Sequence, residues 1–314
     1  MNIIESISEA LLMPEKELLS FSSTAPRRYK KYTIAKRNSD ERRLIAHPSK
    51  EVKFLQRLLV THMEDKLPIH DSANAYIKQK SIKSNAFSHK DNQYLLKMDF
   101  KNFFLSITPD ILLEQILSFG IKINNNNIDF ISGMLFWKLR RNSPLRLSIG
   151  APSSPFISNV VMYNFDCIIE KECKHMGITY TRYADDLTFS TNSKNILFEI
   201  PKLVKNTLKE LYGTRIRVNS DKTVFSSKKF NRHITGVTLT NDNLLSVGRA
   251  KKRYISSLVH KYTLSLLSDD DILLLKGLLS HASNIEPLFI GRLSKKYGVD
   301  VMTNLAPKKF FIDN

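Results

Sequence analysis

The sequence predicts an α+β fold in which strand hairpins and helices occupy different stretches of the chain. Two segments have the pattern of antiparallel hairpins: "YTIA" and "RLIA" on either side of the turn-forming "NSD", and "ITYTRYADDLTFST" further along. From Arg249 onward, apolar residues recur at helical spacing behind capping residues. We therefore expect a mixed body of sheets and helices, followed by a helical part at the C-terminus.

The N-terminal half is predicted to alternate helices with strands. Residues 1–25 form two short helices, because isoleucines and leucines recur there at helical spacing, and residues 50–66 form a longer helix with one apolar face. The segment 95–107 begins as a buried strand and becomes aromatic at its end. A further helix is expected over 110–119, directly after a proline.

The second half repeats this alternation. Residues 147–165 contain a Gly and Pro turn that leads into a helix, for which Ser153 or Ser154 is the expected cap. A helix over about 196–212 follows the second hairpin, and a strand is expected over 215–225.

The composition is that of a folded, strongly basic protein. Of 314 residues, 48 are Lys or Arg and 30 are Asp or Glu, which gives a formal charge of +18. Such an excess of one sign is repulsive within a compact fold, so it predicts a polyanionic partner. The polar run at 124–127 is expected to be a solvated loop.

Targeting signals and a metal-binding cysteine cluster are not expected. Glu5 and Glu9 stand where a signal peptide would carry Lys or Arg, and no apolar run approaches membrane-spanning length, so the prediction is a cytoplasmic protein without a membrane partner. Cys167, Cys173 and His175 lie on one short helical segment and would not close around zinc unaided. We expect two reduced, buried thiols there.

The first hairpin carries an unusual density of positive charge. A solvated basic surface explains any one of these side chains. Together, however, they repel one another unless phosphates or other anions lie against them. The cations are Arg27, Arg28, Lys30, Lys31, Lys36, Arg37, Arg42 and Arg43.

Three aspartates point to chemistry at phosphorus. Asp185 and Asp186 lie in the turn of the second hairpin, where Asp is common for conformational reasons alone, but Asp99 ends a second apolar strand. If these strands are neighbours, two carboxylates at about 4 Å repel by about 4 kcal/mol at an effective dielectric of 20. Mg²⁺ would remove this repulsion, and two such ions roughly 3.5–4 Å apart are the usual machinery of in-line phosphoryl transfer.

The motifs in this order resemble those of a known family. "KMDFKNFF", "GAPSSPFISN" and "YADD" resemble the palm of reverse transcriptases, while "NAFSH" at 85–89 and "ITG" at 234–236 resemble elements of bacterial retron reverse transcriptases. The resemblance implies a right-hand polymerase fold, with fingers, a palm built on an antiparallel sheet, and a C-terminal helical thumb. The expected division is an N-terminal helical segment at 1–25, mainly fingers at 26–95, palm with an interleaved fingers segment at 96–240, and thumb at 241–314.

The resemblance also implies roles for individual residues. Asp99, Asp185 and Asp186 would hold two Mg²⁺ ions, with the backbone carbonyl of Phe100 as a possible addition, and Lys222 would act as a general acid at the leaving pyrophosphate. The expected nucleotide-binding residues are Lys36, Arg43, Phe104, Gly150, Ala151 and Pro152. The expected RNA-binding residues are Asn85, His89, Thr235, Gly236, Arg249, Lys252 and Arg253.

Phe104 has two interpretations. The resemblance places it where these enzymes have a bulky gate against a ribose 2′-OH, and it is also a candidate core aromatic beside Phe103. Two positions depart from the family pattern, since Ile149 replaces the usual Gln and Ile234 the usual Val. The first change removes a polar side chain near the template and the nucleotide.

The implied activity is RNA-directed DNA synthesis by a retron enzyme. It would use dNTPs to copy part of a dedicated structured non-coding RNA into a short DNA, priming from an RNA 2′-OH so that the DNA stays branched to the RNA. An effector protein encoded nearby, a role in defence against phage, and an RNase H supplied by another protein complete the expectation. The alternatives are a group II intron-like or other reverse transcriptase, an RNA-directed RNA polymerase, and a non-catalytic RNA-binding scaffold.

Overall fold

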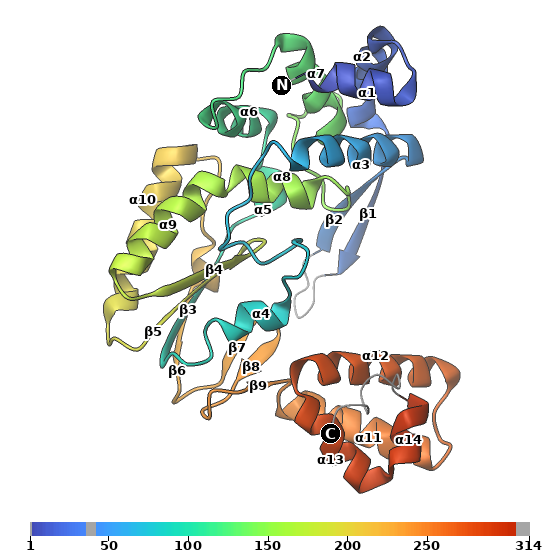
Figure 1. The fold of residues 1–314 in the computed structure, drawn as a ribbon, viewed down its shortest axis with the longest axis vertical. Helices are drawn as coiled ribbons and strands as arrows, with labels where there is room; N and C mark the ends of the chain where they lie inside the picture. Colours follow the sequence, from blue (N-terminus) through green and yellow to red (C-terminus); the bar gives the residue numbers. More distant parts are fainter. Residues whose placement is uncertain (1, 36–41, 306–314) are drawn as a thin grey trace.

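The computed structural model describes residues 2–35 and 42–305, and it confirms the α+β class. Figure 1 shows the N-terminal helices at one end of the molecule, the strands in the middle, and the C-terminal helices as a group at the other end. Among the described residues, no helix is long and apolar enough to cross a membrane.

The predicted N-terminal helices are present. Helices α1 (Ile3–Leu11) and α2 (Glu15–Thr24) pack against α7 (Asn125–Leu135), and α1 also packs against α3 (Lys50–Glu64). The polar run at 124–127 is not a loop: it begins α7, and the buried Asn127 accepts hydrogen bonds from the backbone N–H groups of Ile3 and Ile4 at 2.8 and 2.9 Å. The expected solvated loop was therefore wrong, because this Asn satisfies the free N–H groups of another helix.

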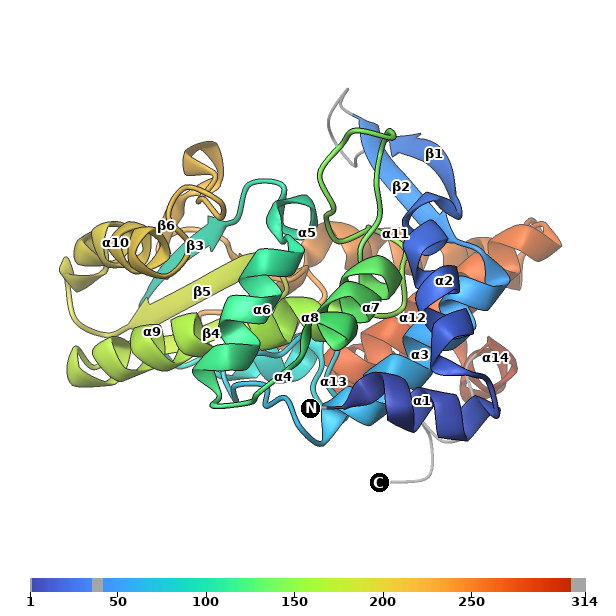
Figure 2. The same ribbon diagram turned by 90° about the horizontal axis from the view of Figure 1, so that it is seen from above.

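The first hairpin consists of β1 (Tyr29–Ala35) and β2 (Arg42–Pro48), paired antiparallel as predicted. It projects from the body of the molecule (Figure 2). The connecting residues 36–41, which include Lys36, lie outside the described residues.

The central sheet has the strand order β4-β5-β3-β6. Its strands are β3 (Tyr94–Asp99), β4 (Thr179–Tyr183), β5 (Asp186–Thr191) and β6 (Val224–Ser227). The predicted strand over 215–225 was wrong for most of its length. Only an isolated bridge between Phe100 and Val218 and a short 3₁₀ turn precede β6, so this segment follows the end of β3 without a ladder of its own.

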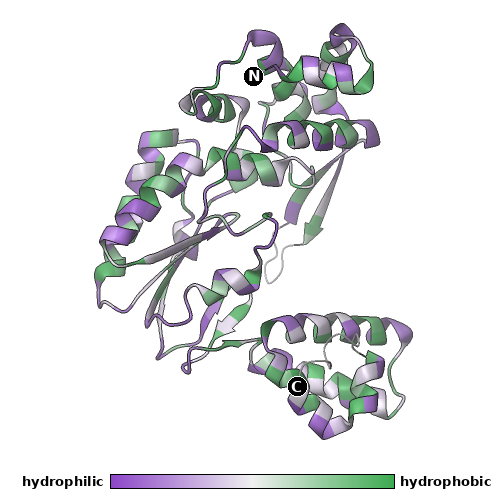
Figure 3. Ribbon diagram, in the orientation of Figure 1, coloured by the Kyte–Doolittle hydropathy of each residue, from purple (hydrophilic) through white to green (hydrophobic). Residues whose placement is uncertain are grey.

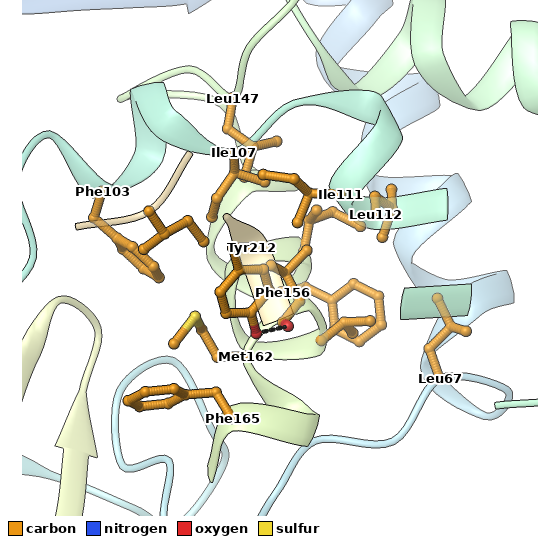
Figure 4. Close-up of a cluster of buried hydrophobic side chains, with 14 of the residues drawn as sticks. Leu67, Phe103, Ile107, Ile111, Leu112, Leu147, Phe156, Met162, Phe165 and Tyr212 are labelled. Carbon is orange, nitrogen blue, oxygen red and sulfur yellow. Dashed lines mark hydrogen bonds between the residues drawn. The ribbon is translucent and has the colours of Figure 1, made fainter. Parts of the chain in front are cut away.

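The two faces of this sheet have different neighbours. On one face the apolar side chains of β3, β4 and β5 join a core with α9 (Tyr163–His175) and α10 (Ile200–Tyr212). Figure 4 shows part of this core, where Tyr212 donates a hydrogen bond of 2.8 Å to the backbone carbonyl of Val161. Onto the other face packs the short helix α4 (Ile82–Phe87). Three helices that complete the body are α5 (Phe103–Ser106), α6 (Pro109–Ser118) and α8 (Ser154–Val161).

Ser153 occupies the cap position of α8, as predicted, but its side chain makes no cap hydrogen bond in the described structure.

A second core joins a small sheet to the C-terminal helices. Residues of α4 and of the strands β7–β9 pack there with apolar residues of the four helices that follow. Figure 3 shows polar and apolar residues side by side on these helices, as expected of amphipathic helices around a small core. The strands are β7 (Arg232–Ile234), β8 (Val237–Leu239) and β9 (Leu245–Ser246), and the helices are α11 (Arg249–Thr263), α12 (Asp269–Ile285), α13 (Pro287–Tyr297) and α14 (Val299–Leu305).

Candidate active site

The structure brings the three aspartates together at one end of the central sheet. Asp99 is the last residue of β3 and lies directly opposite Asp186, the first residue of β5. Asp185 precedes it in the turn, and its backbone carbonyl accepts a hydrogen bond of 3.1 Å from the N–H of Phe100. Asp99 and Asp186, 87 positions apart in the chain, are thereby held within one strand spacing, because strand pairing sets their register.

These carboxylates are short of positive charge. Burial, with Asp185 and then Asp99 as neighbours, raises the pKa of Asp186 to about 6. Burial and then Asp99 raise the pKa of Asp185 as well. Because Asp186 keeps part of its surface in solvent, the neighbouring charges matter alongside burial. A nearby cation would favour the ionised form of both groups.

Asp99 supplies an independent indication that the site suits a cation. Its side chain is 5% exposed, and within the described ranges its Oδ1 atom has no hydrogen-bond partner. The other oxygen, Oδ2, is bonded to the ammonium group of Lys222. Lys222 is thus placed on a carboxylate in this structure, and the hydrogen bond with Asp99 raises the pKa of Lys222.

The residues fit a divalent cation by their chemistry. Hard carboxylate oxygens that are crowded, partly unpaired and reluctant to ionise are suited to Mg²⁺. No set of three His, Cys, Asp or Glu side chains in the described part of the chain already stands in the geometry of a metal centre.

Cys173 is buried and Cys167 only partly buried, and burial raises the pKa of both thiols, to about 12 for Cys173.

A cavity of about 310 Å³ lies on the side of the site toward the first hairpin. Phe104, Gly150, Ala151 and Pro152, all expected at the nucleotide, line it together. Gly150 has φ of +119°, and a Cβ there would come within 3.1 to 3.2 Å of neighbouring atoms of β2. This position therefore suits glycine for two reasons, its backbone conformation and its close packing.

The position of Phe104 is compatible with both interpretations, a core aromatic and a wall of the nucleotide cavity. Its half-buried ring packs edge-on against Phe103 at a centroid distance of 5.6 Å, and it also forms part of the cavity wall. Arg43 is exposed on β2, close enough for its charge to oppose the raised pKa values of Asp185 and Tyr76.

Sequence reasoning missed four residues that line this cavity. Lys53 and Arg57 lie one helical turn apart on α3, and their spacing on the polar face of a recognised helix was a usable signal. His47, on β2, is hydrogen-bonded to Lys53. Tyr76, half-exposed with φ of +62°, lies in a loop for which the sequence had no motif.

A second cavity of about 350 Å³ lies on the other side of the carboxylates. Lys97, Thr188 and Val224 line it beside Asp99 and Asp186. Thr235 also reaches it, from the turn between β7 and β8, where Thr235 has φ of +46° and Gly236 φ of +83°. The buried Oγ1 atom of Thr235 has no partner among the residues that the structure describes.

Direct RNA contact by Asn85 and His89 is contradicted, because both side chains are fully buried. His89 bonds to the hydroxyls of Ser190 and Thr181 at 2.7 and 2.8 Å, and Thr181 donates to Asn85 at 2.6 Å. Burial lowers the pKa of His89 to about 3, so the ring is neutral at physiological pH. These two residues attach α4 to the hairpin β4–β5.

The three cations expected on the C-terminal helices begin α11. Arg249 and Arg253 are exposed. Lys252 instead forms an ion pair of 2.6 Å with Glu286, which also bonds Arg292 and the hydroxyl of Ser246. Lys252 is therefore part of the contact between α11 and α13 and is less available to a phosphate than its two neighbours.

Comparison with known proteins now supplies the family. Residues 34–239, more than half of the chain, match the family model described as reverse transcriptase (RNA-dependent DNA polymerase). The chain is 48% identical over 279 residues to the Retron Ec83 reverse transcriptase of Escherichia coli, covering 88% of this chain and 89% of that protein. It is 31% identical to the Retron Ec73 reverse transcriptase of Escherichia coli, covering 94% and 95%.

Among solved structures, telomerase from Candida albicans in complex with a fragment of telomeric RNA matches 88% of this chain and 60% of that chain, with 13% identity and a TM-score of 0.49.

The chain therefore belongs to the reverse transcriptase family and, within it, to the bacterial retron reverse transcriptases. Its activity is RNA-directed DNA polymerisation, and the reverse transcriptase domain implies dependence on a divalent metal. The predicted right-hand polymerase fold is confirmed with it.

Proposed function

We propose that Asp99, Asp185 and Asp186 hold two Mg²⁺ ions and that the chain copies part of a dedicated structured RNA into a short DNA. The observation that carries the proposal is the convergence of three carboxylates in one strand register, two with raised pKa values and the third with an unpaired buried oxygen. A fold that gained nothing from this charge would not gather it at one end of a sheet, where it costs stability.

The chain's own residues would divide the work around this centre. Arg43 would grip the triphosphate of the incoming nucleotide, because its planar fork matches phosphate oxygens. Gly150, Ala151 and Pro152 would form the floor under the nucleotide, and Phe104 would exclude a ribose 2′-OH from the same cavity.

Metal and proton supply complete the proposed mechanism. When bound, the Mg²⁺ ions would supply Lewis-acid stabilisation of the charge on phosphorus, with the Phe100 carbonyl as a further oxygen ligand. Lys222, like lysines in general, carries a proton at neutral pH, which it would give to the leaving pyrophosphate. To do so, its ammonium group would have to leave Asp99 as the metal enters.

We propose the same division of the chain as the sequence suggests: an N-terminal helical segment at 1–25, fingers mainly at 26–95, palm with an interleaved fingers segment at 96–240, and thumb at 241–314. The separate core of the C-terminal helices supports a thumb. This core also includes residues of β7 and β8, so the small sheet adjoins the thumb and would present Thr235 and Gly236 to the copied RNA.

The retron part of the proposal concerns the product and its partners. The DNA would be primed from an RNA 2′-OH and remain branched to the RNA, an RNase H would come from another protein, and an effector protein encoded nearby would make the system a cytoplasmic defence against phage. Identity to retron enzymes over most of the chain favours this product over that of another reverse transcriptase. Arg249 and Arg253, with the basic first hairpin, provide a surface for RNA phosphates.

The experiment compares the unmodified protein with an Asp185→Asn/Asp186→Asn variant, each purified from its native cell with its bound nucleic acid. We expect RNA-linked DNA with the unmodified protein and RNA alone with the variant. A parallel assay with purified protein should incorporate dNTPs and reject NTPs.

RNA alone in both samples would overturn the branched product. Full biological activity of the charge-neutral variant would show that the protein serves the cell as an RNA scaffold. Equal use of NTPs would remove the role given to Phe104.

A further inference from the structure

A fully buried group of polar side chains adjoins the turn that carries Asp185. Arg182, in β4, has no exposed surface, and neither do its partners Asp166 in α9 and Asn159 in α8. The Nε of Arg182 donates to Asp166 Oδ1 at 2.9 Å, and Nη2 donates to Oδ2 at 2.6 Å. Its Nη1 donates both to Asn159 Oδ1 at 3.0 Å and to the backbone carbonyl of Ala184 at 3.2 Å.

Arg182 contacts the backbone of Ala184, which is in an unfavourable conformation. Ala184 has φ of +56°, a left-handed conformation that costs energy for any residue with a Cβ. Such a conformation persists when surrounding contacts enforce it. Arg182 supplies one of these contacts from the buried side of the turn.

Two hydrogen bonds hold the peptide groups on both sides of Asp185. The carbonyl of Ala184, bound by Arg182, belongs to the peptide that precedes the Asp185 Cα atom. The carbonyl of Asp185, bound by the N–H of Phe100 at 3.1 Å, belongs to the peptide that follows it. Fixing both peptide planes fixes φ and ψ of Asp185, and with them the direction in which its carboxylate leaves the backbone.

The same arginine connects this turn to the nucleotide side of the site. Asn159 uses its Nδ2 atom to donate to the carbonyl of Ala75 at 2.9 Å, next to the cavity residue Tyr76. The backbone of Arg182 itself bonds to Ser72 and Asn74 at 2.8 and 2.7 Å. Arg182 thus joins α8, α9 and the turn that carries Asp185 through its side chain, and the loop before Tyr76 through its backbone.

The buried polar cluster around Arg182 does more than fill space in the core. A buried ion pair is expensive to desolvate and is often replaceable by apolar residues of similar volume without loss of stability. The planar fork of arginine spreads its N–H donors over three nitrogen atoms and so reaches acceptors on three residues, whereas the three donors of lysine all sit on one nitrogen atom. The arrangement therefore suits a residue that sets geometry.

We propose that Arg182 is a positioning residue for DNA synthesis, which holds the Ala184–Asp185 peptide and so aims the Asp185 carboxylate. The proposal rests on the proposed role of Asp185 in catalysis. Arg182 touches neither substrate nor the reacting atoms, and it acts through the turn.

The test uses two variants of the full-length protein. Arg182→Lys keeps the charge beside Asp166 but loses the fork. The double variant Arg182→Met/Asp166→Leu removes the ion pair without leaving an unpaired charge, so it keeps the fold if the single variant does not. In folded protein of either kind we expect kcat on a primed RNA template to fall about 10-fold to 100-fold, with KM for dNTP changed less than about threefold.

A structural measurement accompanies the kinetics. Hydrogen–deuterium exchange of the peptide containing the Phe100 amide should become faster in both variants, because this amide bonds to the displaced Asp185 carbonyl, while peptides of α12 should be unchanged. The matched control is Tyr180→Phe, which removes a 2.7 Å hydrogen bond to Asp166 in the same cluster and leaves the turn untouched. Its kcat should stay within about twofold of the unmodified protein.

An unchanged kcat in the folded double variant would overturn the proposal, as would unchanged exchange at Phe100. Equal losses of kcat in Tyr180→Phe and Arg182→Lys would show that Arg182 only stabilises the fold and does not position Asp185. An Asp185→Asn variant separates the two proposals: if it is active, the assignment of the catalytic site fails, whereas the exchange measurement still tests Arg182.

Discussion

The hairpin β4–β5 is held by two buried polar groups of different kinds: a charged group beside its turn (the charged end) and a neutral group on its opposite face (the neutral end). At the turn, Arg182 and Asp166 form a fully buried ion pair with an Arg Nη2 to Asp Oδ2 distance of 2.6 Å. On the opposite face, His89 bonds to Thr181 and Ser190, and Asn85 bonds to Thr181, without any charge. The charged group contacts the backbone of the catalytic turn, while the neutral group joins two elements of the scaffold.

The difference between the charged and the neutral group indicates where the desolvation cost of a buried charge is offset by what the charge does. A neutral hydrogen bond contributes about 1 kcal/mol and suffices to attach a helix to a sheet. The charged pair brings strong, directional bonds to a turn whose conformation is unfavourable in itself, and it does so where small displacements affect chemistry. The energetic consequences of the two groups should therefore differ in size and in pH dependence.

The largest expected effect breaks the charged end. Asp166→Asn leaves Arg182 buried without its counter-ion, and we expect the free energy of unfolding to fall by about 3–5 kcal/mol. Denaturant unfolding followed by circular dichroism measures it. The Arg182→Met/Asp166→Leu double variant is the control and should lose much less, since no charge is left unpaired. Equal losses in both would mean that packing volume, and not the ion pair, matters at this end.

The neutral end should be weaker. Thr181→Val removes the hydroxyl that bonds to both Asn85 and His89 while keeping the volume of the side chain. We expect a loss of about 1–3 kcal/mol in the same unfolding experiment, because two buried polar groups lose a partner. A loss as large as that of Asp166→Asn would contradict the ranking of the two ends.

The pH dependence should distinguish the neutral end directly. His89 has a pKa lowered to about 3 in the folded protein by burial, whereas the unfolded chain takes up the proton near its ordinary value of 6.5. Between these values the unfolded state binds more protons, so stability is lost as pH falls. From pH 7 to 5.5 the contribution of His89 is a loss of about 1 kcal/mol.

The matched comparison for this prediction is His89→Gln, whose stability should fall less over the same pH interval. Identical pH profiles for the variant and the unmodified protein would show that His89 does not contribute.

The smallest effect is expected for an ion pair that is not buried. Arg215 bonds to Asp110 and Glu114, but its side chain is 33% exposed and theirs are more than half exposed. Replacing it by Gln should cost no more than about 1 kcal/mol, and less still at high salt. A loss of unfolding free energy comparable to that of Asp166→Asn would show that solvent exposure does not explain the difference between the Arg215 and the Arg182 ion pairs.

Several features could be predicted from the sequence because their signals are local. The hairpins, the helices of the C-terminal part and the aspartates at strand ends follow from side-chain period and turn chemistry. The wrong predictions concern packing. The segment 215–223 was predicted as a strand but has, among the described residues, no neighbouring strand with which to form a ladder. Asn127 was predicted to lie in a loop, but its side chain caps a helix far away in the chain.

The motif of Asn85 and His89 shows the same limit. The resemblance identified these positions as important, yet a motif does not say whether a side chain faces a ligand or the interior. Their full burial follows from the packing of α4 between the central sheet and the second core.

By itself, then, the sequence determined the periodicity of the elements, the chemistry available at each turn, the excess of positive charge and the membership of a family. Only the tertiary structure decided that Asp99 faces Asp186, that Arg182 reaches the carbonyl of Ala184, and that His89 is buried. The physical reason is that backbone preference and side-chain period act over a few residues, whereas burial and partner choice depend on contacts between segments far apart in the chain.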